Sequence, residues 1–467
     1  MEEKDILTEP FSHEEKIPEA EQFVQMLDEK RYADFRREIA DVPYADVAEI
    51  FDLFPPEYYI IAFRLLPKEL AAESFVMMDA SMKEHIINGF TDKELSSVLD
   101  ELYLDDTVDI IEEMPAVVVK RILKNSSGEN RSLINQLLKY PKDSAGTIMT
   151  TEYVRLKRDM TVSDALTHLR HVAIDKETIY TCYVTDENRK LIGIVTARQL
   201  LISSLETQLS EIMEESVIFV TTTDDKEEVA NKFKKYGFIA LPVVDAECRL
   251  VGIVTVDDAI DVIEEEAEED FAKMAAVTPS ETPYLKNSVL NIFKSRIPWL
   301  LLLMISATFS STILSFFENN LASILVLFVP MLMDTGGNAG NQTSVTLVRG
   351  LALGEVRLAD FIKVWWRELR VGILCGIALG AVAFAKIMLV DNLLMQNSSV
   401  TVVVAAVVSV TLALTIIIAK FVGSSLPILA SRVGLDPAVM ASPFITTVVD
   451  ALSLIVYYFI AAPFFSA

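Results

Sequence analysis

The sequence predicts a multidomain membrane protein with an α-helical superhelical N-terminal domain, a repeated α/β unit, a long connecting helix and a five-helix transmembrane domain. The uneven charge is the first reason. Residues 297–467 hold 8 Lys and Arg and 8 Asp and Glu, so residues 1–296 carry the whole net charge of −26. The second is an internal repeat in which Gly193 and Gly252 match at a separation of 59 residues. The third is a series of apolar runs near the C-terminus, long enough to cross a bilayer.

The helical domain is predicted over residues 21–140, after an acidic tail at residues 1–20 that we expect to be disordered. Prolines recur at or near the expected helix starts, where their missing N–H has no cost, and apolar residues recur between them at helical spacing. Residues 47–55 (VAEIFDLFP) also resemble residues 108–115 (VDIIEEMP). We therefore expect helical hairpins that stack into a superhelix. The N-terminus lacks the basic start and apolar core of a signal peptide, which predicts a cytoplasmic location for this half.

The α/β unit is predicted twice, over residues 141–205 and 206–263. KLIGIVTARQLL in the first copy matches RLVGIVTVDDAI in the second, and a strand-like run precedes each. This arrangement resembles a tandem pair of CBS domains. In that family the Thr and Asp of a GIVTxxD turn hold an adenosine ribose, so the resemblance implies ATP binding at Thr255 and Asp258. In the first repeat Thr196 is followed by Gln199 instead of the acid, so at most one nucleotide site is expected. The alternative is that these turns only close the domain.

An acidic connecting helix is predicted from the segment DDAIDVIEEEAEEDFAK at residues 257–273, which contains neither Gly nor Pro. We expect the helix to include Asp258 to Lys273 and the connecting domain to cover residues 264–290. Its like-charged residues at i and i+4 destabilise an isolated helix, so we expect something to neutralise them. Two interpretations remain open: a solvated linker, or a helix whose acids share divalent cations such as Mg²⁺ with the other domains. The candidate regulatory ligands are Asp258, Asp261, Glu266, Glu269 and Asp270.

Five membrane spans are predicted within residues 291–467. They lie at residues 297–317, 321–348, 371–390, 400–423 and 439–464. The loop between the second and third spans contains five Lys and Arg residues, which places it in the cytoplasm by the positive-inside rule. We therefore expect a multi-pass cell-membrane protein with cytoplasmic N-terminal domains and an external C-terminus.

Residues 330–342 (PMLMDTGGNAGNQ) combine a proline and three glycines with oxygen-bearing side chains in an apolar setting. Irregular backbone in a bilayer is tolerated only where it is buried in protein or lines a watery cavity. We therefore expect an irregular, pore-lining segment, although its asparagines could instead only join helices. The candidate pore-lining residues are Pro330, Asp334, Thr335, Gly336, Gly337, Asn338, Gly340, Asn341 and Gln342.

The fifth span contains two acids: Asp436 at its cytoplasmic mouth and Asp450 about halfway along. A carboxylate at the bilayer centre costs about 2.5–3.5 kcal/mol on insertion scales. We expect three residues to share the helix face of Asp450. They are Pro443, which would kink the helix, and Thr446 and Thr447, which carry hydroxyls. Lys386 and Lys420 are expected near span ends, so neither is an obvious partner for Asp450. This favours a cation path over a structural ion pair.

The domain order, together with PMLMDTGGNAGNQ and LDP…SPFITTVVD, resembles the MgtE family of magnesium transporters and channels over essentially the whole chain. The resemblance implies a homodimer whose two-fold axis holds a pore, lined by the second and fifth spans, through which Mg²⁺ enters the cytoplasm. It also implies that cytosolic Mg²⁺ bridges the acidic domains and holds the connecting helices over the pore. By motif, Asp450 is the central selectivity carboxylate and Asp436 its neighbour. Asn338, Thr446 and Thr447 are further candidate pore ligands for the metal.

Three other classes of protein remain alternatives. A gradient-coupled secondary transporter of Mg²⁺, Mn²⁺ or Co²⁺ would also place acids at the membrane midplane. An enzyme would need a catalytic constellation, whereas the chain has four histidines, all in the soluble half, so we expect no enzymatic activity. A purely sensory protein would not need Asp450. No nucleic-acid partner is expected.

Overall fold

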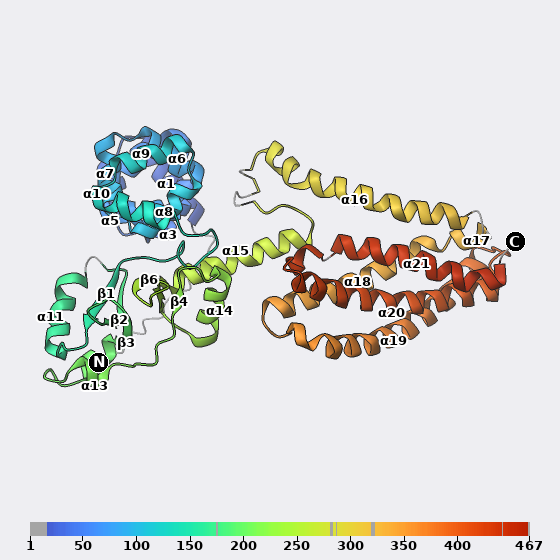
Figure 1. The fold of residues 1–467 in the computed structure, drawn as a ribbon. Coiled ribbons are helices and arrows are strands. Elements are labelled where there is room, and N and C mark those ends of the chain that lie inside the picture. The colour runs from blue at the N-terminus through green and yellow to red at the C-terminus, as the bar shows by residue number, and fades with distance from the viewer. Residues whose placement is uncertain are drawn as a thin grey trace, which may run out of the picture. The chain divides into compact units, whose positions relative to one another are not determined.

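The computed structural model describes residues 16–173, 176–280, 284–285, 287–318, 323–440 and 442–465. The chain forms two compact units, Met1–Ile263 and Glu264–Ala467. The first contains the helical domain and the α/β pair, and the second contains the long apolar helices (Figure 1). Most of the predicted tail at residues 1–20 lies outside the described residues. Helix α1 begins at Lys16, so the prediction of disorder was wrong for residues 16–20.

Short helices wind round in a ring to form the helical domain (Figure 1). Their bounds are α1 (Lys16–Asp28), α2 (Tyr32–Ile39), α3 (Tyr44–Asp52), η2 (Pro56–Tyr58), α4 (Tyr59–Leu65), α5 (Lys68–Met77), α6 (Ala80–Gly89), α7 (Asp92–Leu99), α8 (Leu104–Glu113), α9 (Ala116–Asn125) and α10 (Gly128–Leu137). Pro43, Pro67 and Pro115 directly precede α3, α5 and α9. The prediction that prolines mark the helix starts is thus confirmed.

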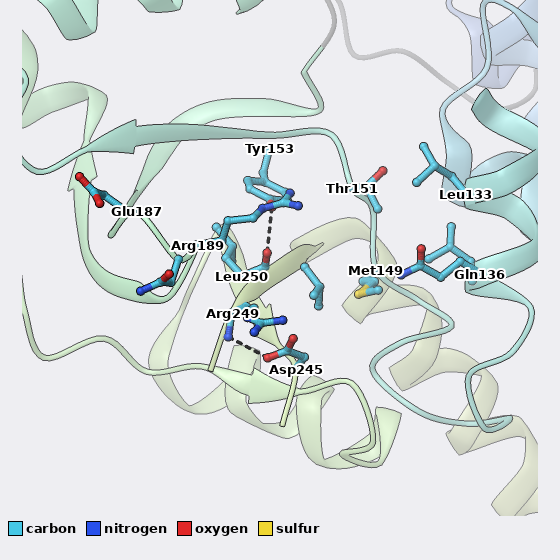
Figure 2. A pocket seen from close by; sticks show the side chains of 13 residues that line it. Leu133, Gln136, Met149, Thr151, Tyr153, Glu187, Arg189, Asp245, Arg249 and Leu250 are labelled. Carbon is cyan, nitrogen blue, oxygen red and sulfur yellow. Dashed lines mark hydrogen bonds between the residues drawn. The ribbon is translucent and has the colours of Figure 1, made fainter. Parts of the chain in front are cut away.

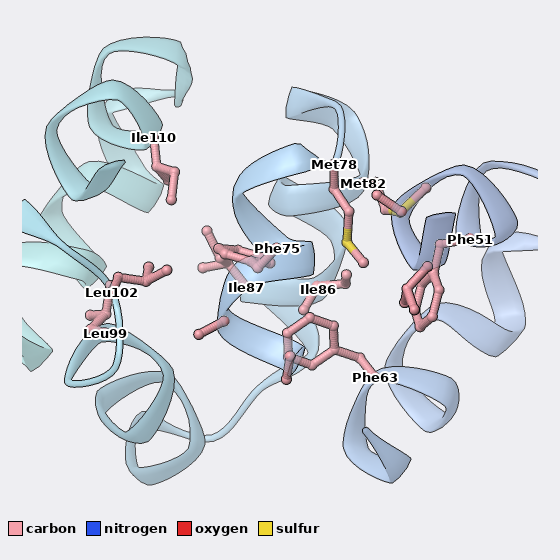
Figure 3. Close-up of a cluster of buried hydrophobic side chains, with 14 of the residues drawn as sticks. Phe51, Phe63, Phe75, Met78, Met82, Ile86, Ile87, Leu99, Leu102 and Ile110 are labelled. Atoms are coloured by element: carbon pink, nitrogen blue, oxygen red, sulfur yellow. The ribbon is translucent and has the colours of Figure 1, made fainter. Parts of the chain in front are cut away.

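Each helix of this domain buries one apolar face, and these faces form a continuous core (Figure 3). Phe51, Phe63 and Phe75 come from three successive stretches of the chain and are all almost fully buried. The ring of Phe63 meets those of Phe51 and Phe75 edge to face, at centroid distances of 6.5 and 5.6 Å, a favourable arrangement for aromatic pairs. Because no helix is long enough to be stable alone, the domain depends on this shared core.

The α/β pair consists of two three-stranded sheets with the same strand order. The elements are β1 (Tyr153–Lys157), α11 (Val162–Val172), β2 (Thr178–Thr185), β3 (Leu191–Thr196), α12 (Ala197–Ile202), α13 (Leu209–Ile212), β4 (Val220–Thr221), α14 (Lys226–Tyr236), β5 (Ala240–Val244) and β6 (Leu250–Thr255). In each sheet the first strand runs parallel to the second, and the second runs antiparallel to the third. The predicted repeat is confirmed.

The matching glycines of the two repeats have the same physical role. A Cβ on Gly193 would lie 2.9 Å from the Met213 sulfur, and a Cβ on Gly252 would lie 2.7 Å from the Met149 sulfur. Met213 belongs to the second repeat and packs against the glycine strand of the first. Met149 belongs to the first repeat and packs against the glycine strand of the second. The glycine and the methionine were therefore repeated together in the sequence because they touch in the fold.

Helix α15 (Val256–Met274) begins directly after β6 and carries the acidic run. The helix includes the predicted stretch from Asp258 to Lys273, whereas the predicted domain bounds of 264 and 290 were wrong, because the helix starts before the first and ends well before the second. The helix is continuous across Ile263 and Glu264, where the two compact units divide.

The second unit contains the long apolar helices. Its elements are α16 (Val289–Glu318), α17 (Ser323–Val326), α18 (Val329–Ala352), η4 (Leu358–Asp360), α19 (Phe361–Lys386), the π-helix η5 (Ile387–Leu394), α20 (Val402–Arg432), η6 (Pro437–Met440) and α21 (Ser442–Phe465). Helix α20 packs against α18, α19 and α21 and is buried over much of its length. It therefore forms the centre of this unit.

Four stretches of the described helices are long and apolar enough to cross a membrane. They are Val289–Phe316, Leu358–Leu394, Val402–Arg432 and Pro437–Phe465. These correspond to the first, third, fourth and fifth predicted spans. Helix α18 has 24 residues, which suffices for a crossing by length, but its polar residues set it apart from the other four. Residues 321–322 of the predicted second span lie outside the described residues, and that span stays a prediction.

Candidate ion pathway and regulatory site

Helix α18 has two faces of opposite character. The face that packs on the bundle is made of small residues, and those buried there are Gly336, Gly337, Ala339, Gly340, Thr343 and Ser344. The exposed positions Asp334, Asn338, Gln342, Val345 and Arg349 recur every three or four residues and so share the other face. A helix in an apolar unit thus carries a polar stripe on the side that the bundle does not cover.

The glycines of α18 serve close helix packing. A Cβ on Gly336 would lie 2.6 Å from the Thr415 methyl group of α20, and one on Gly337 would lie 3.0 Å from the Thr446 methyl group of α21. Small residues let neighbouring helices approach in this way within membranes. The prediction of an irregular backbone over residues 330–342 was wrong, because α18 is a continuous α-helix and Pro330 stands in its first turn, where proline is tolerated.

Asp450 lies on α21 beside the polar stripe of α18. One of its carboxylate oxygens, Oδ1, is buried and receives no hydrogen bond among the described residues. Asp334 of α18 is the charged group that interacts electrostatically with it. The side-chain oxygen of Asn341 is also buried and without a hydrogen-bond partner in the described part of the chain. The structure thus brings together two carboxylates, Asp334 and Asp450, from the two segments singled out by the sequence.

The hydroxyl-bearing residues of α21 lie in the same region. The Thr446 side chain contacts Gly337, and the Thr447 hydroxyl donates a hydrogen bond of 3.1 Å to the Pro443 carbonyl. Pro443 is the second residue of α21, so it begins the helix, and the predicted kink at this position was wrong. Both threonine oxygens keep lone pairs that could accept from a water molecule.

Lys386 and Lys420, the two lysines considered as partners for Asp450, are both engaged elsewhere. Lys386 pairs with Asp391 at 2.8 Å. Lys420 lies in the interior of α20, because that helix continues to Arg432, and it interacts with Glu368 of α19. The expected position of Lys420 near a span end was therefore wrong. The expectation that neither lysine pairs with Asp450 is confirmed for the described residues.

Asp436 is held by the connecting helix. The Lys273 ammonium of α15 donates a 2.6 Å hydrogen bond to Asp436 Oδ2 and also pairs with Glu269 at 2.7 Å. Burial lowers the pKa of Lys273, but the Asp436 and Glu269 carboxylates outweigh it and raise that pKa above its ordinary value. Burial, with Asp436 next in effect, raises the pKa of Asp270. A direct contact therefore joins α15 to the segment that precedes α21.

The first unit contains a cluster of acids that the sequence interpretation largely missed. Asp105 and Asp106 begin α8, Glu152 precedes β1, Glu177 precedes β2, and Asp258 lies in the first turn of α15. Burial, together with neighbouring carboxylates, raises the pKa of Asp105 and of Asp258 to about 7 and that of Glu177 to about 8. It also raises the pKa of Asp106 to about 6 and that of Glu152 to about 7.

Several oxygens of this acidic cluster lack hydrogen-bond partners. They are Asp105 Oδ1, Glu152 Oε2 and Glu177 Oε2, all buried. Buried carboxylate oxygens are ordinarily paired, and hard divalent cations favour such ligands. Among the described residues, no three acidic, histidine or cysteine side chains are arranged to hold a metal ion. A bound cation would therefore need the carboxylates to draw closer together. In the sequence, the pair Asp105 and Asp109, four residues apart on α8, was the feature that could have indicated this acidic cluster.

The turns expected to bind a nucleotide differ in their surroundings. Gln199 Oε1 accepts from the Thr196 N–H and hydroxyl at 2.7 and 2.8 Å, and its Nε2 donates to the Ile212 carbonyl at 3.2 Å. Its amide oxygen and one of its N–H groups are thus engaged by Thr196 and Ile212. In the second repeat Asp258 accepts from the Thr255 N–H and hydroxyl and belongs to the acidic cluster. Nucleotide binding at Thr255 and Asp258 stays a prediction.

A cavity of about 530 Å³ lies between α10 and the turns that join β2 to β3 and β5 to β6 (Figure 2). Arg189 and Arg249 reach it from those two turns. Asp245 accepts a 2.8 Å hydrogen bond from the Arg249 N–H, and the Tyr153 hydroxyl donates to the Leu250 carbonyl at 3.1 Å. The residues of the acidic cluster and Thr255 are not among those that line it, so it is separate from both.

Family profiles match the chain in three regions. Residues 42–143 match the MgtE intracellular N domain, residues 145–206 and 209–265 match the CBS domain, and residues 329–460 match the divalent cation transporter domain of MgtE. Together with the fold, these matches define the class as a divalent cation transporter with a CBS pair.

The relatives narrow this class. The magnesium transporter MgtE of Thermus thermophilus is 35% identical over 432 residues, which cover 91% of this chain and 94% of the relative. The magnesium transporter MgtE of Bacillus subtilis is 31% identical over 441 residues, with coverage of 94% and 96%. The chain belongs to the MgtE family.

Two solved structures resemble the chain. One is the cytosolic domain of the Mg²⁺ channel MgtE in complex with ATP, with a TM-score of 0.50 and 36% identity, covering 52% of this chain and 99% of that one. The other is the soluble part of a magnesium transporter, with a TM-score of 0.51 and 30% identity, covering 54% of this chain and 100% of that one.

Proposed function

We propose that this protein is an Mg²⁺ channel that works as a homodimer and conducts along the polar face of α18. The observation that carries this proposal is the exposed stripe of Asp334, Asn338 and Gln342 on a helix of the apolar unit. Polar groups facing lipid are costly, so this face must be covered by protein or line water. A second copy related by a two-fold axis presents the same face in return, and the two faces together enclose a polar path.

The carboxylates of Asp450 and Asp334 select the ion. In a symmetric dimer each acid appears twice, so four carboxylates face the path. Mg²⁺ releases its water reluctantly, and we expect the acids to hold the ion through its own water shell. Asn338, Asn341 and Thr446 supply neutral oxygens to the same waters. Such a site favours divalent over monovalent ions, whereas it discriminates weakly among Mg²⁺, Mn²⁺ and Co²⁺.

Cytosolic Mg²⁺ regulates the channel through the acidic cluster of the first unit. Its partnerless carboxylate oxygens and raised pKa values support this role, because a cation would relieve both. Asp258 belongs to this cluster, whereas Asp261, Glu266, Glu269 and Asp270 lie further along the same helix α15. We propose that they are the regulatory ligands and that α15 transmits closure to the pore mouth, where Lys273 contacts Asp436.

The membrane orientation follows from the basic loop before α19. Arg349 lies in the last turn of α18, Arg357 in the loop and Lys363 in the first turn of α19. We place this basic region in the cytoplasm together with the N-terminal domain and the CBS pair. The C-terminus then lies outside after five crossings. Adenine nucleotide binding at Thr255 and Asp258 is a further proposal, supported by the ATP complex of the similar cytosolic domain.

The test is ion flux in vesicles that contain the purified protein. We expect Asp450→Ala to abolish Mg²⁺ uptake while the dimer still folds, because the pore then loses its central pair of charges. Glu355→Ala is the matched control, since Glu355 is an exposed acid of the same unit outside the proposed path. Wild-type flux in Asp450→Ala would remove this residue from the mechanism.

A gradient-coupled transporter is the second candidate, because the ion-paired Lys420 and Glu368 inside the helical bundle resemble the charged relays of such proteins. Flux that disappears when proton and sodium gradients are collapsed would favour coupling. Mg²⁺ flux that follows only the Mg²⁺ gradient and the membrane potential would favour the channel.

A further inference from the structure

We propose that Lys420, Thr343 and Glu368 form a polar clamp that fixes the rotation of α18 and so keeps its polar face toward the ion path. Lys420 of α20 and Thr343 of α18 are 6% and 5% exposed. The Lys420 ammonium donates to the Thr343 hydroxyl at 3.0 Å, and that hydroxyl donates to Glu368 Oε2 at 2.9 Å. This inference rests on the proposed channel function and names positioning residues for it.

The clamp is costly, which argues for a specific role. The buried Lys420 ammonium loses most of its hydration inside an apolar bundle, and the Glu368 carboxylate, whose side chain is 22% exposed, loses part of its own. The attraction between the two charges often repays only part of such a loss. The ammonium lies 3.8 Å from Glu368 Oε2, so the Thr343 hydroxyl is the group that contacts both charged partners closely. Three apolar residues of similar size would pack here without this cost. The polar trio adds a fixed orientation of α18, because its hydrogen bonds are satisfied in one relative arrangement of α18, α19 and α20.

The rotation of α18 needs to be fixed here because the neighbouring contact between α18 and α20 is made by two glycines. Gly340 of α18 touches Gly423 of α20 so closely that a Cβ on Gly423 would collide with the Gly340 carbonyl. Thr343 follows Gly340 by one helical turn, and Lys420 precedes Gly423 by one turn. Two glycine surfaces have no side chains that interlock, so they permit α18 to rotate or slide. The clamp, one turn away, prevents this motion.

The clamp and the pore acid lie on opposite sides of α18. Thr343 follows Asp334 by nine residues, which is about two and a half turns of an α-helix. An inward-pointing Thr343 hydroxyl therefore requires an outward-pointing Asp334. Asn338 and Gln342 share the exposed side with Asp334. Holding one hydroxyl in the bundle thus sets the orientation of the whole polar stripe.

The decisive variant is Thr343→Val, which keeps the shape and removes only the hydroxyl. In vesicles we expect normal dimer yield, but the permeability ratio of Mg²⁺ to K⁺ should fall by about tenfold or more, as for the loss of a hydrogen bond to a charged group. Thr343→Ser keeps the hydroxyl and should restore the wild-type ratio. An unchanged ratio in Thr343→Val, beside a selective wild type, would overturn the inference.

A charge-balanced variant separates positioning from simple charge compensation. Lys420→Met combined with Glu368→Gln removes both charges, leaves no unpaired ion, and should fold even if a single substitution does not. We expect this double variant to conduct with the same reduced selectivity as Thr343→Val. Wild-type selectivity in the double variant would show that the trio only neutralises itself and would overturn the inference. A wild type that conducts no Mg²⁺ would instead overturn the proposed function, and none of the variants would then show Mg²⁺ flux either.

Discussion

Asp105 occupies a position that an ordinary structural aspartate avoids. It is 8% exposed, its Oδ1 has no hydrogen-bond partner among the described residues, and its closest charged neighbours are other acids. Burial raises its pKa to about 7, and Glu177 and Asp258 are raised similarly. Burying such acids opposes folding when they are ionised, and the cation that we propose for this cluster would offset that cost.

The acidic cluster makes the stability of the first unit depend on pH. Folding raises the pKa values of these acids, so the same acids ionise at a lower pH in the unfolded chain than in the folded protein. The folded state therefore loses stability as the pH rises from about 4 to about 8. For a fragment of residues 16–263 without divalent ions, we therefore expect a lower midpoint of thermal unfolding at pH 8 than at pH 5. Mg²⁺ should raise the midpoint strongly at about pH 8 and little at about pH 5, where protons occupy the carboxylates.

The control for this prediction is the combined variant Asp105→Asn and Asp258→Asn, which keeps the shape of both side chains. It should lose most of the pH dependence and most of the Mg²⁺ response, measured by circular dichroism during heating. An equal Mg²⁺ effect at both pH values would contradict the role assigned to these acids.

At the scale of elements, α18 combines two requirements in one helix. Its buried face is small enough for α20 and α21 to approach closely, and its exposed face is polar. Glycine lowers helix propensity by about 1 kcal/mol relative to alanine, so the four glycines of α18 would weaken an isolated helix. Packing against α20 and α21 offsets this, which is why composition suggested an irregular segment while the fold contains a continuous helix.

Gly423→Ala tests the close contact of α18 with α20. The added methyl group would meet the Gly340 carbonyl, a backbone atom that cannot move without moving its helix. We expect a loss of stability of about 1–3 kcal/mol, the usual cost of overpacking, seen as a lower temperature for heat-induced aggregation of the detergent-solubilised dimer. Ala406→Leu adds more atoms at an exposed position of the same helix and should have little effect. Equal stability of the two variants would contradict this packing.

At the scale of the whole molecule, α15 is the link that we propose between sensing and conduction. It begins with Asp257 and Asp258 beside the acids of the first unit, and its last turn carries Lys273, which binds Asp436. In this proposal a rigid helix transmits a displacement along its axis, and several weak cation sites acting together make closure steep. Repulsion among the acids of the first unit would then oppose closure when divalent ions are scarce.

Neutralising the acids of α15 tests this link. The combined change of Asp258, Asp261 and Asp270 to Asn and of Glu266 and Glu269 to Gln should leave conduction intact. We expect the variant to stay open at cytosolic Mg²⁺ concentrations that close the wild type, measured in membrane patches with stepped Mg²⁺. Neutralising Glu129 and Glu187, exposed acids of the same unit outside the acidic cluster, is the control. An unchanged closing midpoint would mean that the acidic run is only a solvated linker.

Local sequence patterns were sufficient to predict much of the structure of this protein. The CBS repeat was predictable because each copy is closed by the same glycine turn, and the turn residues are neighbours in the chain. The starts of the short helices were predictable because proline acts on its own backbone. Asp450 could be singled out because a carboxylate in an apolar run is costly whatever surrounds it.

The tertiary structure decided what depends on residues distant in the chain. Asp105, Glu152 and Asp258 form one cluster only after three separate segments meet, so no single stretch of sequence identified it. The partner of Lys420 comes from another helix, and the glycines of α18 are explained by atoms of α20 and α21. The sequence by itself determined the order of the domains and the acid that we propose for the pore, because propensity and hydropathy are local. The contacts around that acid and within the acidic cluster are pairwise across the fold, and only folding brings their partners together.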